Sequence, residues 1–362
     1  MPKSVYIHIP FCKSKCHYCS FVSYPKEELK KDYLKVLEYE INSIYEGEPL
    51  NTLYFGGGTP SLLSSEEFDN LMRHFNINSK TEITAELNPD DLSFSYLRSL
   101  YDSGINRISI GAQSFDDAIL KIINRRHSSG QIIQAVENAL NAGFKNISLD
   151  FIYGLPNQSG EMFYDDLKRA VNLGVEHISL YGLSIEEGCY FYKNRPKDLA
   201  DDDSQADMYL GAVELLKNSG FGHYEISNFA KTGFESKHNL NYWNNEEYYG
   251  FGVSAHGYLN GVRYGNQIII EDYIKNPLKR CEERFETEKD KLEEEIFLGF
   301  RKMSGINLAS INSKFGIDFE KKYSKILKKY EELKLLEKTL YGYKLTSNGV
   351  LVSNAILAEF LE

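Results

Sequence analysis

Residues 4–19 read SVYIHIPFCKSKCHYC, a short β-branched run followed at once by three cysteines. The run Ser4–Ile9 alternates apolar and polar side chains, which predicts a β-strand. Cys12, Cys16 and Cys19 form a C-x3-C-x2-C array in the loop that follows it. Three thiolates at this spacing suit three corners of a [4Fe–4S] cubane and leave one iron without a protein ligand, whereas electron-transfer clusters take four cysteines.

An iron without a protein ligand is open to the amino and carboxylate groups of S-adenosylmethionine. An electron from the cluster then cleaves the S–C bond and gives a 5′-deoxyadenosyl radical, so the cofactor carries the difficult chemistry. The alternative is a zinc site with His17 or a distant residue as fourth ligand. Zinc sites usually combine two paired half-motifs, and the other two cysteines, Cys189 and Cys281, are isolated. We interpret both as packing residues.

The composition of the 362-residue chain is typical of a globular protein, with 42% hydrophobic and 26% charged residues. The net charge of −11 disfavours an extended nucleic-acid surface. No apolar run approaches the roughly 20 residues of a membrane helix, and the N-terminus does not resemble a secretory signal. Five cysteines, three of them clustered, suit a reducing compartment. We therefore expect a cytoplasmic protein without a transmembrane segment and without a nucleic-acid partner.

Short β-branched runs alternate with amphipathic helical patterns in the first 220 residues. Six such units in series predict a parallel sheet with right-handed crossovers. Because a closed barrel of this kind needs eight strands, the expected fold is an open, partial (β/α)6 barrel. The expected strands are 4–9, 51–55, 81–87, 106–110, 146–151 and 177–183. The expected helices are 26–45, 65–75, 93–102, 129–142, 160–173 and 204–219.

Local signals mark where these helices begin and end. Ser64 with Glu67, and Ser128 with Gln131, fit capping boxes at helix starts. Glycines follow four helical stretches at the spacing expected of a left-handed stop. These glycines are Gly104, Gly143, Gly174 and Gly220.

The alternation stops after about residue 221. We expect residues 1–220 to form the barrel, 221–278 to extend it, and 279–362 to form a small winged-helix-like α+β module. In that module the pattern reads as three helices, a hairpin at 339–345 and a final helix at 347–361.

Polar residues gather where the predicted strands end. Gly56-Gly57-Gly58-Thr59-Pro60 follows the second strand, and a glycine run allows close approach to a small polar ligand or makes a tight turn. Glu86, Gln113 and Asp150 also lie at or just beyond carboxyl ends of strands. These ends form the active face of a β/α barrel.

The stretch Tyr6–Cys12 with its C-x3-C-x2-C array resembles the radical S-adenosylmethionine (SAM) superfamily, in the branch that contains the HemN coproporphyrinogen III dehydrogenases and the HemW heme chaperones. The resemblance runs from Val5 past Trp243 and more weakly through the C-terminal module. It implies a [4Fe–4S] cluster on the three cysteines. It implies SAM contacts from Tyr6, Tyr18, Gly57, Gly58, Thr59, Glu86, Gln113, Arg125 and Asp150, with Arg125 preferred over the adjacent Arg126.

Three features favour the chaperone family. The dehydrogenases carry a further cysteine two positions after the third cluster cysteine, where this chain has Phe21, and they have a longer segment before the motif than the eleven residues here. His238–Trp243 matches the H-N-x-x-Y-W motif associated with heme binding in the chaperones. The resemblance thus implies a heme carrier, with His238 as axial ligand and a hemoprotein as client. A SAM-dependent coproporphyrinogen III dehydrogenase, another tetrapyrrole-modifying radical SAM enzyme and an RNA-modifying enzyme are the alternatives, so catalysis stays open.

Overall fold

A computed structural model describes residues 2–361 of the chain. Its main feature is a curved nine-stranded sheet in which β1 to β6 lie side by side in chain order, all parallel. The expectation of six parallel strand–helix units in an open barrel is confirmed. The six strands are β1 (Ser4–Ile9), β2 (Thr52–Gly57), β3 (Glu82–Leu87), β4 (Arg107–Gln113), β5 (Ile147–Tyr153) and β6 (His177–Gly182).

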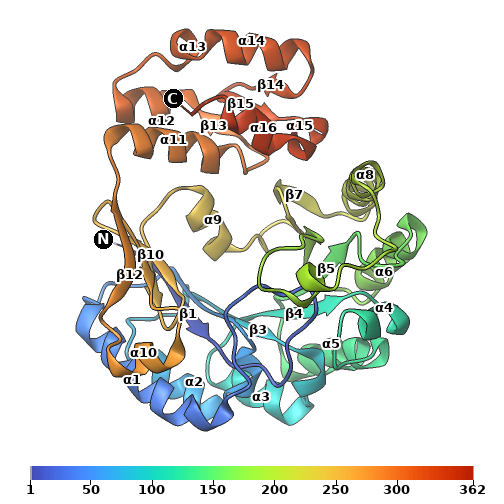
Figure 1. The fold of residues 1–362 in the computed structure, drawn as a ribbon, viewed down its shortest axis with the longest axis vertical. Helices are drawn as coiled ribbons and strands as arrows, with labels where there is room; N and C mark the ends of the chain where they lie inside the picture. Colours follow the sequence, from blue (N-terminus) through green and yellow to red (C-terminus); the bar gives the residue numbers. More distant parts are fainter. Residues whose placement is uncertain (1, 362) are drawn as a thin grey trace.

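Helices cover the outer, convex side of this sheet (Figure 1). They are α1 (Lys30–Ile44), α2 (Ser65–Met72), α3 (Phe94–Asp102), α4 (Asp117–Ile122), α5 (Ser129–Ala142), α6 (Gly160–Asn172) and α8 (Asp202–Asn218). Val5, Ile7 and Ile9 of β1 are fully buried in the apolar core with residues of these helices. Tyr6 and His8, which alternate with them, point to the opposite, concave side. The concave side therefore carries the polar side chains, and the candidate site lies on this side.

The helix signals read from the sequence are present in the structure. Ser64 accepts a hydrogen bond from the Glu67 N–H while the Glu67 side chain accepts one from the Ser64 N–H. The Ser128 N–H donates to Gln131 Oε1 at 2.9 Å. The four predicted stop glycines all have positive φ, from 80° to 111°. These signals are confirmed because each depends on only a few consecutive residues.

Three short strands that the sequence did not indicate extend the sheet at both edges. β9 (Tyr249–Phe251) pairs in parallel with β1, and β8 (Asn228–Ala230) pairs antiparallel with β6. β7 (Gly222–Glu225) then pairs with β8. Strands of three or four residues carry too little periodicity to be recognised. Their partners, far away in sequence, decide their conformation.

The rest of the segment after residue 230 forms α9 (Lys237–Trp243), α10 (Ile270–Lys275) and a second, antiparallel sheet. The strands of that sheet are β10 (His256–Leu259), β11 (Val262–Asn266) and β12 (Arg280–Phe285). β12 pairs with β11, so the chain still contributes to this sheet just after residue 279. The placing of a domain boundary at 278/279 stays a prediction.

The C-terminal module has its own three-stranded sheet, in the order β13-β15-β14, and its own apolar core. The small α+β module expected from the sequence is present, but its hairpin strands lie at 336–338 and 342–345, and two short helices at 347–351 and 353–358 replace the single final helix expected at 347–361. Figure 1 shows the module over the open side of the barrel, with α9 lying between the two. Its elements are α11 (Glu288–Gly299), β13 (Ile306–Asn307), α12 (Leu308–Phe315), α13 (Phe319–Lys322), α14 (Ser324–Glu332), β14 (Leu336–Lys338), β15 (Gly342–Leu345), α15 (Ser347–Leu351) and α16 (Ser353–Ala358). In residues 2–361, no helix has the length and apolar character needed to cross a membrane.

Candidate cluster and cofactor site

A cavity of about 470 Å³ opens at the carboxyl ends of the parallel strands. The structure brings all but two of the predicted site residues to its wall. The wall residues among the predictions are Cys12, Cys16, Tyr18, Cys19, Gly57, Gly58, Thr59, Glu86, Gln113, Arg125 and Asp150. Tyr6 and His238 do not line this cavity.

The loop that carries the three cysteines is held at several points. The Cys12 N–H donates to the Tyr24 carbonyl, and the Cys19 N–H donates to the Cys16 carbonyl. His17 Nδ1 lies 2.8 Å from the Ile122 carbonyl oxygen at the end of α4. These bonds fix the loop against the barrel, so all three thiols face one cavity.

The three thiols do not converge on one point. Within residues 2–361, no group of three His, Cys, Asp or Glu side chains is arranged to hold a single metal ion. A cubane takes one thiolate on each of three irons, so its ligands stand farther apart than those of a single ion. Burial raises the pKa of the Cys19 thiol to about 11. A bound metal's charge deprotonates a coordinating thiol outright. The donor set therefore fits the cluster that the sequence indicates.

The glycine run has a role that its sequence alone left open. Gly57 has φ +110°, and a Cβ on it would lie 2.5 Å from the His8 ring. A Cβ on Gly58 would lie 2.8 Å from the Phe11 carbonyl oxygen. The Gly58 N–H donates to the Ile9 carbonyl at 2.8 Å. The missing side chains thus let the end of β2 press against the start of the cysteine loop.

Two carboxylates lie toward the carboxyl ends of the strands, Glu86 on β3 and Asp150 on β5, with β4 between them. Glu86 accepts from the Tyr54 hydroxyl at 2.7 Å and from the Gly57 N–H at 3.1 Å. Burial, with a smaller contribution from the nearby Asp150, raises the pKa of Glu86 to about 7. Asp150 accepts from the hydroxyls of Ser109 and Ser148, and burial raises its pKa too. Both groups line the cavity as acceptors suited to ligand hydroxyls.

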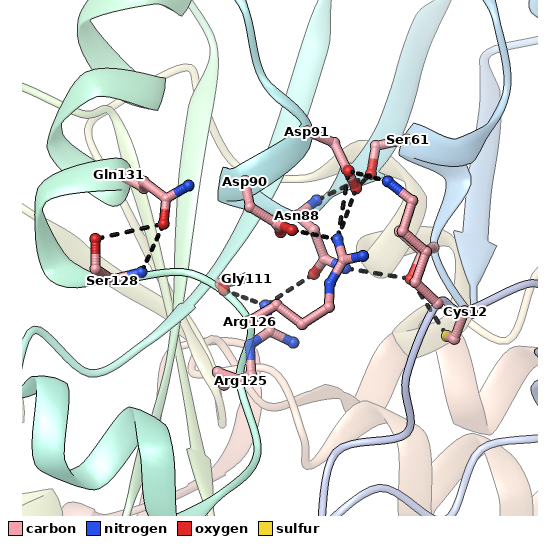
Figure 2. A network of polar contacts seen from close by, with 12 residues as sticks. Cys12, Ser61, Asn88, Asp90, Asp91, Gly111, Arg125, Arg126, Ser128 and Gln131 are labelled. Carbon is pink, nitrogen blue, oxygen red and sulfur yellow. Dashed lines mark hydrogen bonds and ion pairs between the residues drawn. The ribbon is translucent and has the colours of Figure 1, made fainter.

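Arg125 and Arg126 are adjacent in sequence but differ in position. Arg125 NH2 donates to Asn88 Oδ1 at 2.8 Å and to the Gly111 carbonyl at 2.7 Å, as Figure 2 shows. Arg126 instead pairs with Asp90 and Asp91. The buried Nε of Arg125 has no hydrogen-bond acceptor among residues 2–361. A buried donor of this kind fits the carboxylate of a bound ligand.

Asn88 is a cavity residue that the sequence analysis did not single out. Its amide contacts both Arg125 and Thr59. A signal was available, because Asn88 directly follows β3, at the same sheet end as Glu86. Strand ends alone do not tell which of several polar residues turns toward the cavity.

Tyr6 and His238 lie deeper in the concave side of the barrel, outside the cavity wall. The Tyr6 hydroxyl lies 3.1 Å from His8 Nδ1. His238 is 1% exposed, with Nδ1 2.7 Å from Thr52 Oγ1 and Nε2 2.8 Å from the Tyr242 hydroxyl. Burial lowers the pKa of His238 to about 3, so the ring is neutral. Both of its nitrogens are hydrogen-bonded in this conformation.

Comparison with known proteins agrees with this architecture. The family model described as "Radical SAM superfamily" matches residues 6–170, and the one described as "HemN C-terminal domain" matches residues 287–352. The solved structure of coproporphyrinogen III oxidase (HemN) from Escherichia coli has a TM-score of 0.87 at 24% identity. The alignment covers 99% of this chain and 90% of that one. At this identity the likeness shows the fold.

Sequence relatives are closer. The heme chaperone HemW of Lactococcus lactis is 40% identical over 99% of this chain and 97% of its own length. The heme chaperone HemW of Bacillus subtilis is 39% identical over 99% of both chains. An identity of this size over whole chains shows the family that the cysteine array and the barrel had indicated. The chain belongs to the heme chaperone HemW family of the radical SAM superfamily.

Proposed function

We propose that the chain holds a [4Fe–4S] cluster on Cys12, Cys16 and Cys19, binds SAM beside it, and carries heme to a client hemoprotein in the cytoplasm. Membership of the radical SAM superfamily implies the cluster and SAM. The observation that carries the residue assignment is a single cavity lined by three thiols, one arginine with a free donor and three carboxylates, Glu86 and Asp150 among them.

The protein's own groups have distinct parts in this proposal. Arg125 Nε–H holds the methionine carboxylate of SAM by a charge-assisted hydrogen bond. Glu86 and Asp150 accept hydrogen bonds from the ribose hydroxyls. A reduced cluster held by the three cysteines would supply the electron for cleavage of the S–C bond of SAM. Tyr18 and the backbone of Gly57 and Gly58 complete the wall around the ligand.

The HemW relatives favour heme handling over coproporphyrinogen oxidation. Phe21, which stands where the dehydrogenases have a further cysteine, lines the cavity and is 68% exposed. A phenyl ring there adds an apolar surface at the mouth and has no ionisable group. This position therefore suits contact with an apolar ligand face and not acid–base or redox chemistry.

We propose His238 as the heme ligand, with access through Tyr242. The Tyr242 hydroxyl that bonds His238 Nε2 belongs to a ring lining a second cavity of about 590 Å³. Trp243 and Phe297 also line this cavity, which lies between α9 and α11. A neutral imidazole is a good iron ligand. When the Tyr242 hydroxyl moves aside, Nε2 of His238 becomes free to bind iron. The aromatic side chains that line the cavity can pack against the face of a porphyrin.

Hemin titration with matched histidine variants tests this assignment. His177 is the control because it is also fully buried, with Nδ1 near Ser148 Oγ and Nε2 near the Tyr224 hydroxyl. We expect stoichiometric hemin binding, followed by absorbance, in the wild type and in His177→Ala but not in His238→Ala. Equal binding by both variants, each with native circular dichroism, contradicts the ligand assignment.

Anaerobic turnover separates the chaperone from the dehydrogenase. The reconstituted protein is given SAM, a reductant and coproporphyrinogen III, after electron paramagnetic resonance (EPR) spectra confirm that the cluster responds to SAM. We expect no protoporphyrinogen. Product accumulating over many turnovers contradicts the chaperone proposal and establishes the alternative.

A further inference from the structure

Asn88 lies between two side chains that each touch a cluster cysteine. Its Oδ1 accepts from Arg125 NH2 at 2.8 Å, and its Nδ2 donates to Thr59 Oγ1 at 3.3 Å. Arg125 NH1 donates to Cys16 Sγ at 3.4 Å, and Thr59 Oγ1 lies 3.2 Å from Cys12 Sγ. The contacts form one continuous chain from Cys12 through Asn88 to Cys16. Figure 2 shows the part of it that joins the labelled Cys12, Asn88 and Arg125.

Chemistry fixes the direction of the two hydrogen bonds that the Asn88 side chain makes in this chain. An arginine side chain can only donate, so the atom of Asn88 that faces Arg125 is its carbonyl oxygen. The amide nitrogen then faces Thr59, where it donates to the hydroxyl oxygen. Thr59 Oγ1 lies 3.2 Å from Cys12 Sγ, and either atom of this pair can donate while Cys12 is a thiol. Once Cys12 is a cluster thiolate, only the Thr59 hydroxyl has a proton to donate. Asn88 thus directs one donor at each of two cysteine sulfurs.

The backbone of Asn88 is itself held in place. Its N–H donates to Ser61 Oγ at 3.2 Å, and the Ser61 hydroxyl donates to Asp91 Oδ2 at 3.0 Å. Lys13, the neighbour of Cys12 in sequence, pairs with Asp91 at 3.0 Å. The support for Asn88 is therefore anchored in the cysteine loop at one end and in the turn after β3 at the other.

We propose that Asn88 is a positioning residue that aims the Thr59 hydroxyl and the Arg125 guanidinium at the thiolates of Cys12 and Cys16, and so raises the reduction potential of the cluster. The inference rests on the cluster site proposed above. Donors to cluster sulfurs stabilise the reduced state, which carries one more negative charge, and such hydrogen bonds are among the factors that set cluster potentials.

The test is a redox titration of the reconstituted cluster, followed by EPR in the absence of SAM. Asn88→Leu removes both amide contacts at similar volume. Asn138→Leu is the matched control, because Asn138 Nδ2 donates to the Leu92 carbonyl, just beyond Asn88, and contacts no cysteine. At the wild-type midpoint we expect Asn88→Leu to raise the ratio of oxidised to reduced cluster at least tenfold, a shift of about 59 mV. The control should not shift.

A double variant tests whether Asn88 acts through Thr59. Thr59→Val should lower the potential less in the Asn88→Leu background than in the wild type, because the hydroxyl is no longer aimed. If Asn88→Leu loads less than a full complement of iron, Asn88→Ala is titrated in its place.

An unchanged midpoint in a fully loaded Asn88 variant overturns the inference. A wild-type protein that assembles no cluster overturns the proposed cluster site instead, and iron content distinguishes these two failures. Full additivity of the Asn88 and Thr59 effects also overturns the positioning role.

Discussion

Glu86 makes the stability of the metal-free chain depend on pH in a predictable way. It lies at the end of β3 against Tyr54 and Gly57, and burial raises its pKa from 4.5 to about 7. The folded pKa is above the unfolded one, so the fold favours the protonated carboxyl. Ionisation therefore stabilises the unfolded chain as the pH rises. The loss of stability caused by ionising Glu86 is absent well below pH 4.5, grows between pH 4.5 and pH 7, and is complete above pH 7.

The size of the penalty follows from the pKa difference. One pKa unit is 1.36 kcal/mol, so the rise from 4.5 to about 7 corresponds to about 3 kcal/mol. Glu86 is surrounded by protein atoms but keeps part of its surface open to the cavity. Water in the cavity screens the charge, and we therefore expect about 2 kcal/mol between pH 5 and pH 8.

Glu86→Gln removes the ionisation. The amide also changes the contacts with Tyr54 and Gly57, but the change in stability that this causes does not depend on pH. Urea unfolding of wild type and variant at pH 5 and pH 8 gives two differences in the free energy of unfolding. We expect the free energy of unfolding of the variant, taken relative to wild type, to increase by about 2 kcal/mol from pH 5 to pH 8. The same difference at both pH values would refute the reasoning.

Three further substitutions test the packing of the fold. Gly57→Ala places a Cβ 2.5 Å from the His8 ring at φ +110°. We expect the free energy of unfolding to fall by at least about 2 kcal/mol and the iron content after reconstitution to be lower. An iron content equal to that of wild type would contradict this. Ser64→Ala removes the helix cap of α2 and should cost about 1 kcal/mol in thermal unfolding, with no change in cluster loading. Glu40→Ala removes a fully buried carboxylate that pairs with the partly buried Arg280 at 2.8 Å, and it should lower the free energy of unfolding in urea by about 3–5 kcal/mol. An effect below 1 kcal/mol would show that solvent reaches the pair.

Much of the fold could be predicted because its signals are local. The cysteine array, the strand periodicity and the capping boxes each occupy a few consecutive residues, and the structure contains the six parallel strands and the stop glycines that they indicated. The rule that polar residues at carboxyl ends of parallel strands meet at one face indicated the glycine run, Glu86, Gln113 and Asp150. The cysteine spacing and the family resemblance supplied the other candidates, and eleven of the thirteen predicted site residues line one cavity.

The features that the sequence missed depend on contacts between distant parts of the chain. β9 is only three residues long and is a strand because β1 offers it an edge. His238 is buried because Thr52, 186 positions earlier, and Tyr242 occupy its two nitrogens. Tyr242 stands in the same motif, but nothing in the sequence around His238 shows Thr52, so its burial could not be read from the motif.

The amino-acid sequence by itself determined which atoms are available for a cluster and on which face of the barrel they meet. Only the tertiary structure decided how those atoms are oriented. Arg125 reaches Cys16 across 109 positions and Asn88 reaches Thr59 across 29. A hydrogen bond needs its partners within about 3 Å and in the right direction. Such geometry comes from the packing of whole strands and loops, which no short pattern of residues specifies.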